Sequence, residues 1–90
     1  MKAILYIEGT NNGADFLKDY SEQEINLESL YKDIDVNSPP LANLTTSDNK
    51  VHTIQMMDVR FIDDFVFIHC YITDKGGNGG KALVRLKPIN

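Results

Sequence analysis

Alternating apolar and polar residues predict four β-strands in this chain, because successive side chains of a strand point to opposite faces. The longest predicted strand has a break in its alternation near Gln55 and Met56, which indicates a β-bulge. The strand after it has one wholly apolar face that includes Cys70, and we expect this face to lie in the core. The four predicted strands cover residues 2–8, 51–62, 65–73 and 81–87.

A helical period replaces the strand period between the first and second of these strands. Ser21 and Glu24 have the spacing of a capping box, in which each side chain can bond the backbone N–H of the other residue. This pattern predicts a helix from Glu22 to Ile34, preceded by one or two helical turns over 14–20. The apolar residues that share one face of the longer helix are Leu27, Leu30, Tyr31 and Ile34.

Residues 35–49 are predicted to form a long loop, because Pro39 and Pro40 cannot continue a helix. Leu41 and Leu44 are the residues expected to attach this loop to the core. The order strand, helix, strand, strand, strand predicts an α+β fold, a mainly antiparallel four-stranded sheet with one or two helices packed on one face. Residues 1–90 are expected to form a single small domain.

The composition of the chain limits the cellular compartments and the kinds of site that we expect. The net charge is −4, and it is uneven: residues 1–48 carry a net charge of −6, and residues 49–90 a net charge of +2. No apolar run is long enough to span a membrane or to form a signal peptide. The single cysteine, Cys70, excludes an intramolecular disulfide and a cysteine-based zinc site. We therefore expect a cytoplasmic protein without a cofactor, a metal site or membrane contact, and with no direct contact to nucleic acid.

No arrangement of residues predicts an active site, so we do not expect an enzyme. The acidic surface favours a small inhibitor or regulator, of the immunity, anti-defence or adaptor type, that associates with a protein partner with a basic surface. A surface that only keeps the protein soluble is the alternative interpretation. The carboxylates expected to contact the partner lie on the predicted helix and just after it: Glu22, Glu28, Asp33 and Asp35.

A second surface is expected to support self-association. Phe65, Phe67 and Tyr71 lie on the face of the third predicted strand that a single helix would leave uncovered. A second copy of the chain would cover these rings in a homo-oligomer. The competing explanation is that the long loop folds back over them.

Two glycine-rich segments support an alternative function, a small-ligand or nucleotide-binding module. Residues 9–13 lie between a strand and a helix, and residues 76–80 connect the last two strands. Glycine allows backbone N–H groups to approach an anion closely. The second segment is not a phosphate-binding P-loop, because Ala82 stands where that motif requires serine or threonine. The residues expected to contact an anion there are Lys75, Gly77, Gly79 and Lys81.

Overall fold

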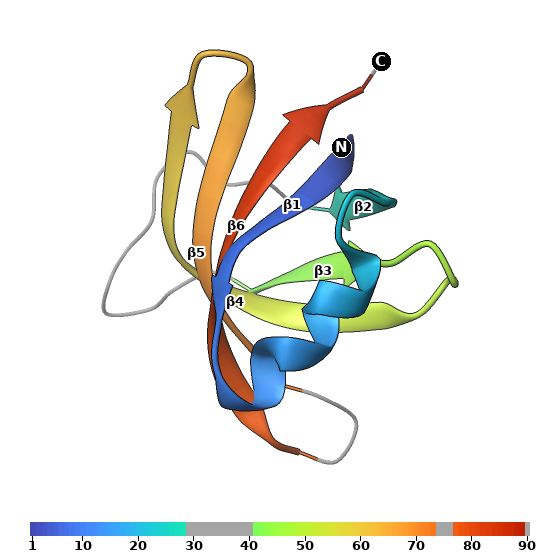
Figure 1. The fold of residues 1–90 in the computed structure, drawn as a ribbon, viewed down its shortest axis with the longest axis vertical. Coiled ribbons are helices and arrows are strands. Elements are labelled where there is room, and N and C mark those ends of the chain that lie inside the picture. The colour runs from blue at the N-terminus through green and yellow to red at the C-terminus, as the bar shows by residue number, and fades with distance from the viewer. Residues whose placement is uncertain (29–40, 74–76, 90) are drawn as a thin grey trace.

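The computed structural model describes residues 1–28, 41–73 and 77–89, and over these residues it shows a closed antiparallel barrel of six strands with one helix (Figure 1). Each strand pairs with the next one along the chain, and β6 pairs with β1 to close the barrel. The elements are β1 (Lys2–Thr10), the 3-10 helix η1 (Asn12–Tyr20), β2 (Glu24–Glu28), β3 (Leu41–Thr45), β4 (Val51–Ile62), β5 (Phe65–Thr73) and β6 (Gly79–Pro88).

Alternate residues of all six strands fill the barrel interior. The face of β5 that contains Cys70 is buried, which confirms the prediction made from its apolar pattern. Removing a large aliphatic side chain from water contributes about 1.5–3 kcal/mol, so these residues supply most of the stabilising free energy. The largest of the fully buried side chains are Leu5, Leu17, Ile25, Leu27, Met56, Ile68, Ile72 and Leu86.

The predicted helix over 22–34 is wrong in the part that the structure describes, where the chain makes a turn and then forms β2. Glu22 has a left-handed φ of 64°, and its N–H donates to the carbonyl oxygen of Leu5. β2 then pairs with β1 on one side and β3 on the other. Ile25 and Leu27, two residues apart, are both buried. The hydrogen-bonded pairing of β2 with a strand on each side outweighs the local preference of the capping-box sequence for a helix.

Part of the predicted 35–49 loop also forms a strand, β3, which pairs with the first half of β4. Leu44 is buried as expected, whereas Leu41 is exposed. The residues before Leu41 in this segment lie outside the described residues. Two short strands thus join the four predicted ones, and the fold is a β-barrel and not the predicted α+β fold with a four-stranded sheet. Such short strands carry too few core residues for their period to show in the sequence.

η1 lies where the sequence predicts helical turns, and it packs against the barrel. Ala14 and Leu17 are fully buried and belong to the same core as the strands, while Phe16 and Tyr20 lie against that core. Figure 1 shows η1 running along one side of the barrel from the end of β1 toward β2. The helix therefore adds two residues to the barrel core.

Two glycines allow the segment before η1 to approach the start of β6. The N–H of Asn11 donates to the carbonyl oxygen of Lys81 at 3.1 Å, and the N–H of Lys81 donates to Oδ1 of Asn11 at 2.8 Å. A Cβ atom on Gly80 would overlap the carbonyl oxygen of Asn11. A Cβ atom on Gly13 would lie 2.5 Å from the carbonyl oxygen of Asn78. The two segments therefore pack backbone against backbone, which requires glycine.

We expect Gly80→Ala to lower the free energy of unfolding by about 1–3 kcal/mol, because the added methyl group meets backbone and not a movable side chain. Gly9→Ala is the matched control, since nothing lies within 4 Å of the position of its Cβ atom. Urea denaturation followed by circular dichroism measures both variants. Equal losses of stability in the two variants would contradict the close packing at Gly80.

Candidate functional site

The outward face of β4, β5 and β6 contains a shallow hollow that is lined by three apolar and three polar residues. Its volume is about 330 Å³. Ile62 is the last residue of β4, Leu83 lies in the middle of β6, and Phe67 of β5 lies between them. We call the lining residues the outer patch: Asp58, Arg60, Ile62, Phe67, His69 and Leu83.

Strand register brings the outer patch together from three strands. Asp58 lies opposite His69 and Arg60 lies opposite Phe67 in the pairing of β4 with β5. His69 in turn lies opposite Leu83 in the pairing of β5 with β6. Directly opposed side chains on one face of a sheet are in contact range. The patch is therefore held by backbone pairing and needs no loop to form.

A β-bulge decides which side chains of β4 belong to the outer patch. The register with β5 shifts between Met56 and Asp58, close to the predicted position. Before the bulge, even-numbered residues such as Ile54 are buried. After it, the exposed even-numbered residues Asp58 and Arg60 alternate with the partly buried Val59. If the alternation continued through Met57 without a bulge, the two charged side chains would face the core.

The apolar residues of the outer patch are exposed although the barrel core is filled without them. Ile62 is 47% exposed and Leu83 is 43% exposed, and Phe67 between them is half-buried. Their chain neighbours Val66 and Val84 point inward and are buried. Single exposed apolar residues are normal on protein surfaces. Here Ile62, Phe67 and Leu83 lie around one hollow.

An arginine packed between two rings borders the outer patch. The Cζ atom of Arg85 lies 4.7 Å from the ring centroid of Tyr6 and 4.5 Å from that of Phe65. Its Nε atom forms an ion pair with Oε1 of Glu8 at 3.0 Å. Phe65 also meets Phe67 edge to face, with ring centroids 6.4 Å apart. These cation–π and aromatic contacts hold the rings in defined positions.

The three residues expected to support self-association lie on this same outward face. Phe67 belongs to the outer patch, and Phe65 packs beside it. Tyr71 lies further along β5, where its ring covers Gly79 of β6. The structure therefore places Phe65 beside Phe67 and places Tyr71 apart from both, against Gly79.

The four carboxylates expected to contact a partner do not form one helical patch over the described residues. Glu22 lies in the turn before β2, and Glu28 is the last residue of β2. Both are exposed. Asp33 and Asp35 lie outside the described residues. Over residues 22–28 a turn and β2 replace the predicted helix, so Glu22 and Glu28 do not share a helical face.

The two glycine-rich segments do lie together, around a second shallow hollow of about 490 Å³. The close packing of the two backbones already explains why two of these glycines are needed. Asn11 also accepts the hydrogen bond from the backbone N–H of Lys81. Gly77 has a left-handed φ of 83°, and Lys75 lies outside the described residues. The hollow is lined by Asn12, Gly13, Asn78 and Gly79.

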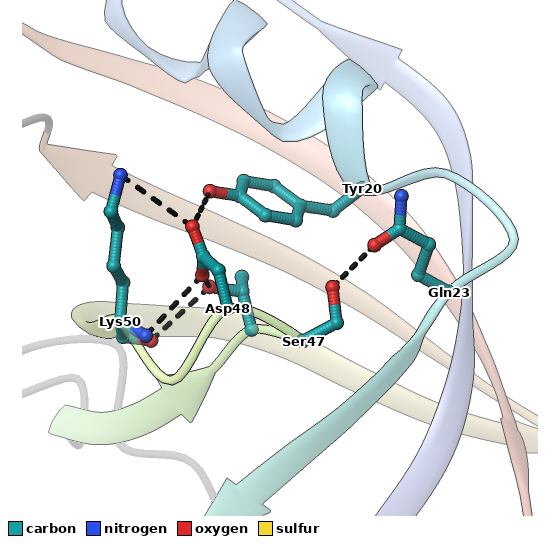
Figure 2. A network of polar contacts seen from close by, with 6 residues as sticks. Tyr20, Gln23, Ser47, Asp48 and Lys50 are labelled. Carbon is teal, nitrogen blue, oxygen red and sulfur yellow. Dashed lines mark hydrogen bonds and ion pairs between the residues drawn. The ribbon is translucent and has the colours of Figure 1, made fainter.

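A polar network joins η1 to the turn between β3 and β4 (Figure 2). The hydroxyl of Tyr20 donates to Oδ2 of Asp48 at 2.7 Å, and that of Thr46 donates to Oδ1 at 2.6 Å. The N–H of Lys50 donates to Oδ1 at 3.3 Å, and its Nζ atom lies 3.5 Å from Oδ2. The carboxylate of Asp48 thus accepts hydrogen bonds on both oxygens and connects η1 with the β3–β4 turn. We call this set of contacts the clamp.

Hydrogen bonding shifts the pKa values of two members of this network in opposite directions. The bond from Thr46, followed by that from Tyr20, holds the pKa of Asp48 below its ordinary value of 3.8. The bond to Asp48 raises the pKa of Tyr20. Both shifts favour the state in which the carboxylate is charged and the phenol is protonated. The clamp is therefore formed at neutral pH.

The single cysteine is unreactive in this fold. Cys70 is 2% exposed, and burial raises the pKa of its thiol to about 12. Thiolate is therefore scarce at neutral pH. His69 points to the opposite face of β5 from Cys70, so the two side chains cannot act together. Over residues 1–28, 41–73 and 77–89, no group of three His, Cys, Asp or Glu side chains is placed to hold a metal ion.

Comparisons with protein-family models, with curated proteins and with solved structures find no match for this chain. In the part of the chain that the structure describes, no helix has the length and apolar character needed to cross a membrane.

Phe67 is the residue of the outer patch that the sequence predicted as part of a binding surface, and the other five were missed. Leu83 does have a signal, because it is an apolar residue among the charged outward positions of β6. Asp58 and Arg60 have none, since their direction depends on the bulge and their neighbours depend on strand register. The bulge and the strand register depend on the pairing of β4 with β5, and a local sequence pattern does not show this pairing.

We expect Asp48→Asn to reduce the loss of stability of the protein in acid. Because the folded pKa of Asp48 is lowered, its charged form stabilises the fold above pH 3.8, and this contribution is lost as the pH falls further. The urea midpoint of the wild type should therefore fall more steeply below pH 4 than that of the variant. Asp64→Asn, which removes an exposed carboxylate from the turn after β4, is the control. Parallel curves for wild type and Asp48→Asn would show that the clamp is energetically unimportant.

Proposed function

We propose that the protein is a binding module, an inhibitor or regulator that associates with another protein through the outer patch and carries out no reaction of its own. The observation that carries this proposal is the exposure of Ile62 and Leu83 on either side of Phe67, in a barrel whose core is filled without them. Burying these side chains against a partner would be favourable, at about 25 cal/mol for each Å² of apolar surface removed from water.

The composition of the outer patch supports a protein partner. Protein interfaces have an apolar centre inside a polar rim and are enriched in aromatic residues and arginine. Phe67 provides the aromatic centre, while Arg60 and Asp58 form part of the rim. The rings of Phe65 and Tyr71 extend the surface along β5 toward the area of about 800 Å² per partner that stable complexes bury. Because paired strands hold these residues, binding requires little ordering.

A cytoplasmic setting belongs to the same proposal. It is supported by the single, buried cysteine, since proteins of oxidising compartments commonly use disulfides. A partner with a basic surface was expected because of an acidic helix that the structure replaces with β2.

We expect Leu83→Glu to weaken binding of the partner at least about tenfold, or 1.4 kcal/mol, because it replaces an apolar contact by a charged group that must lose its hydration in the complex. Val51→Glu is the matched control, since Val51 is 61% exposed on β4 and lies outside the outer patch. Crosslinking in native lysate with mass spectrometry identifies the partner, and titration with the purified partner measures the affinity. Equal weakening in both variants, or in neither, would contradict the proposal.

Light scattering tests whether the partner is a second copy of the chain. Self-association through Phe65, Phe67 and Tyr71 stays a prediction, and it requires a dimer at high micromolar concentration that Leu83→Glu dissociates. A monomer under these conditions leaves the outer patch free for a different protein.

The meeting of the two glycine-rich segments favours a second candidate function, the small-ligand or nucleotide-binding module. Lys81 is an exposed cation two residues after Gly79 of that hollow, and it lines a separate hollow together with Thr10 and Asn11. An exposed charge contact contributes at most about 1 kcal/mol, so we expect millimolar or high-micromolar affinity for nucleotides. Calorimetry with mono-, di- and cyclic nucleotides measures it. Submicromolar binding that Lys81→Ala abolishes would favour this function over the binding module.

A further inference from the structure

A column of cationic side chains lies next to a column of rings on the outward sheet face. Lys81 and Lys87 are exposed on β6, and Arg85 between them is packed between two rings. Across the pairing with β5, Lys81 lies opposite Tyr71 and Arg85 lies opposite Phe67. Leu83 occupies the outward position of β6 between Lys81 and Arg85. Apolar and cationic contacts are therefore available side by side.

The outward face of β4, β5 and β6 is positive on a protein that is negative as a whole. The net charge of the chain is −4. Asp58 is the acidic residue among the outward-facing positions of these strands, and it is ion-paired with Arg60 at 2.9 Å. The cationic residues on the same face are Arg60, Lys81, Arg85 and Lys87. Arg85 is ion-paired with Glu8 of β1, and Lys87 lines a hollow that Asp63 and Asp64 also line. Among the described residues Lys81 and Lys87 form no ion pair, so they are the cations available to a partner. Charge complementarity therefore points to a partner surface of negative charge.

We infer that the partner presents an acidic segment with an apolar side chain at its centre, an inference that rests on the proposed function of the outer patch. The apolar side chain would enter the hollow beside Phe67 and Leu83. Carboxylates of the segment would then reach Lys81 on one side and Lys87 on the other. The expectation of a basic partner is replaced by one of an acidic segment.

Strand geometry sets the spacing of this segment. Lys81 and Leu83 are two residues apart on β6, or roughly 7 Å, and Leu83 and Lys87 are four residues apart, or roughly 13 Å. An extended segment that lies along β6 repeats its side-chain direction every second residue. It would therefore carry its acidic residues two positions to one side of the apolar residue and four positions to the other.

Two other occupants fit this face less well. Two copies meeting patch to patch would bring the Lys81 and Lys87 side chains of both near each other, which opposes association. Single-stranded nucleic acid would need open ring faces on which bases can stack. The guanidinium of Arg85 already lies over the rings of Tyr6 and Phe65. The rings thus serve as walls of an apolar site more than as a stacking platform.

Selection from a displayed library of random 12-residue peptides tests the inference. The library is selected on the wild type and then depleted of peptides that also bind Leu83→Glu. We expect the enriched peptides to be acidic, with the spacing given above. Lys81→Gln and Lys87→Gln should each weaken the best peptide about twofold to fivefold. Lys18→Gln is the matched control, because Lys18 is an exposed lysine of η1.

The outcomes separate this inference from the proposed function. Enriched peptides that depend on Leu83 but are neutral or basic would overturn the acidic segment and leave the binding module standing. A library with no peptide that depends on Leu83 would overturn both. A fluorescein-labelled oligonucleotide of twelve thymidines is assayed in parallel. Tight binding of that strand, lost in Leu83→Glu and Lys87→Gln, would make nucleic acid the partner and overturn the inference.

Discussion

The pairing of β6 with β1 is the interaction on which the rest of the structure depends. It runs from Ala3 opposite Pro88 to Thr10 opposite Ala82 and joins the two ends of the sheet. Once the sheet closes, all inward faces meet in one core, and all outward faces are left to solvent or to a partner. An apolar side chain that points outward, such as Leu83, cannot then be covered by that core. Closure thus creates both the stability of the barrel and its exposed patch.

The strands with a long run of alternating residues could be predicted from the sequence, and the two short strands, β2 and β3, could not. β5 has four buried residues in strict alternation, and such a pattern has no other simple explanation. β2 and β3 have two buried residues each, which is too few to define a period. Around Ser21 and Glu24 the local capping signal also favoured a helix. The two short strands are determined by their neighbours in the closed sheet.

The candidate site, too, could be predicted from the sequence only in part. Phe65, Phe67 and Tyr71 could be recognised from the sequence because they lie on the second face of a strand whose first face is wholly apolar. Their neighbours could not, because a single bulged residue in β4 turns Asp58 and Arg60 outward. A change of one residue in register reverses every side chain of a strand. Local patterns therefore identify a surface, and long-range pairing decides its chemistry.

The separation of charge has a kinetic consequence for a partner with an acidic segment. At physiological ionic strength the Debye length is about 8 Å, so the net negative charge of the chain acts weakly on a distant partner. Within that length the nearby cations of β6 dominate, and Lys81 and Lys87 act on the segment only once it is close. Such a face gives little long-range steering. Its selectivity for acidic segments would therefore reside in the rate of dissociation of the complex, where short-range contacts have their effect.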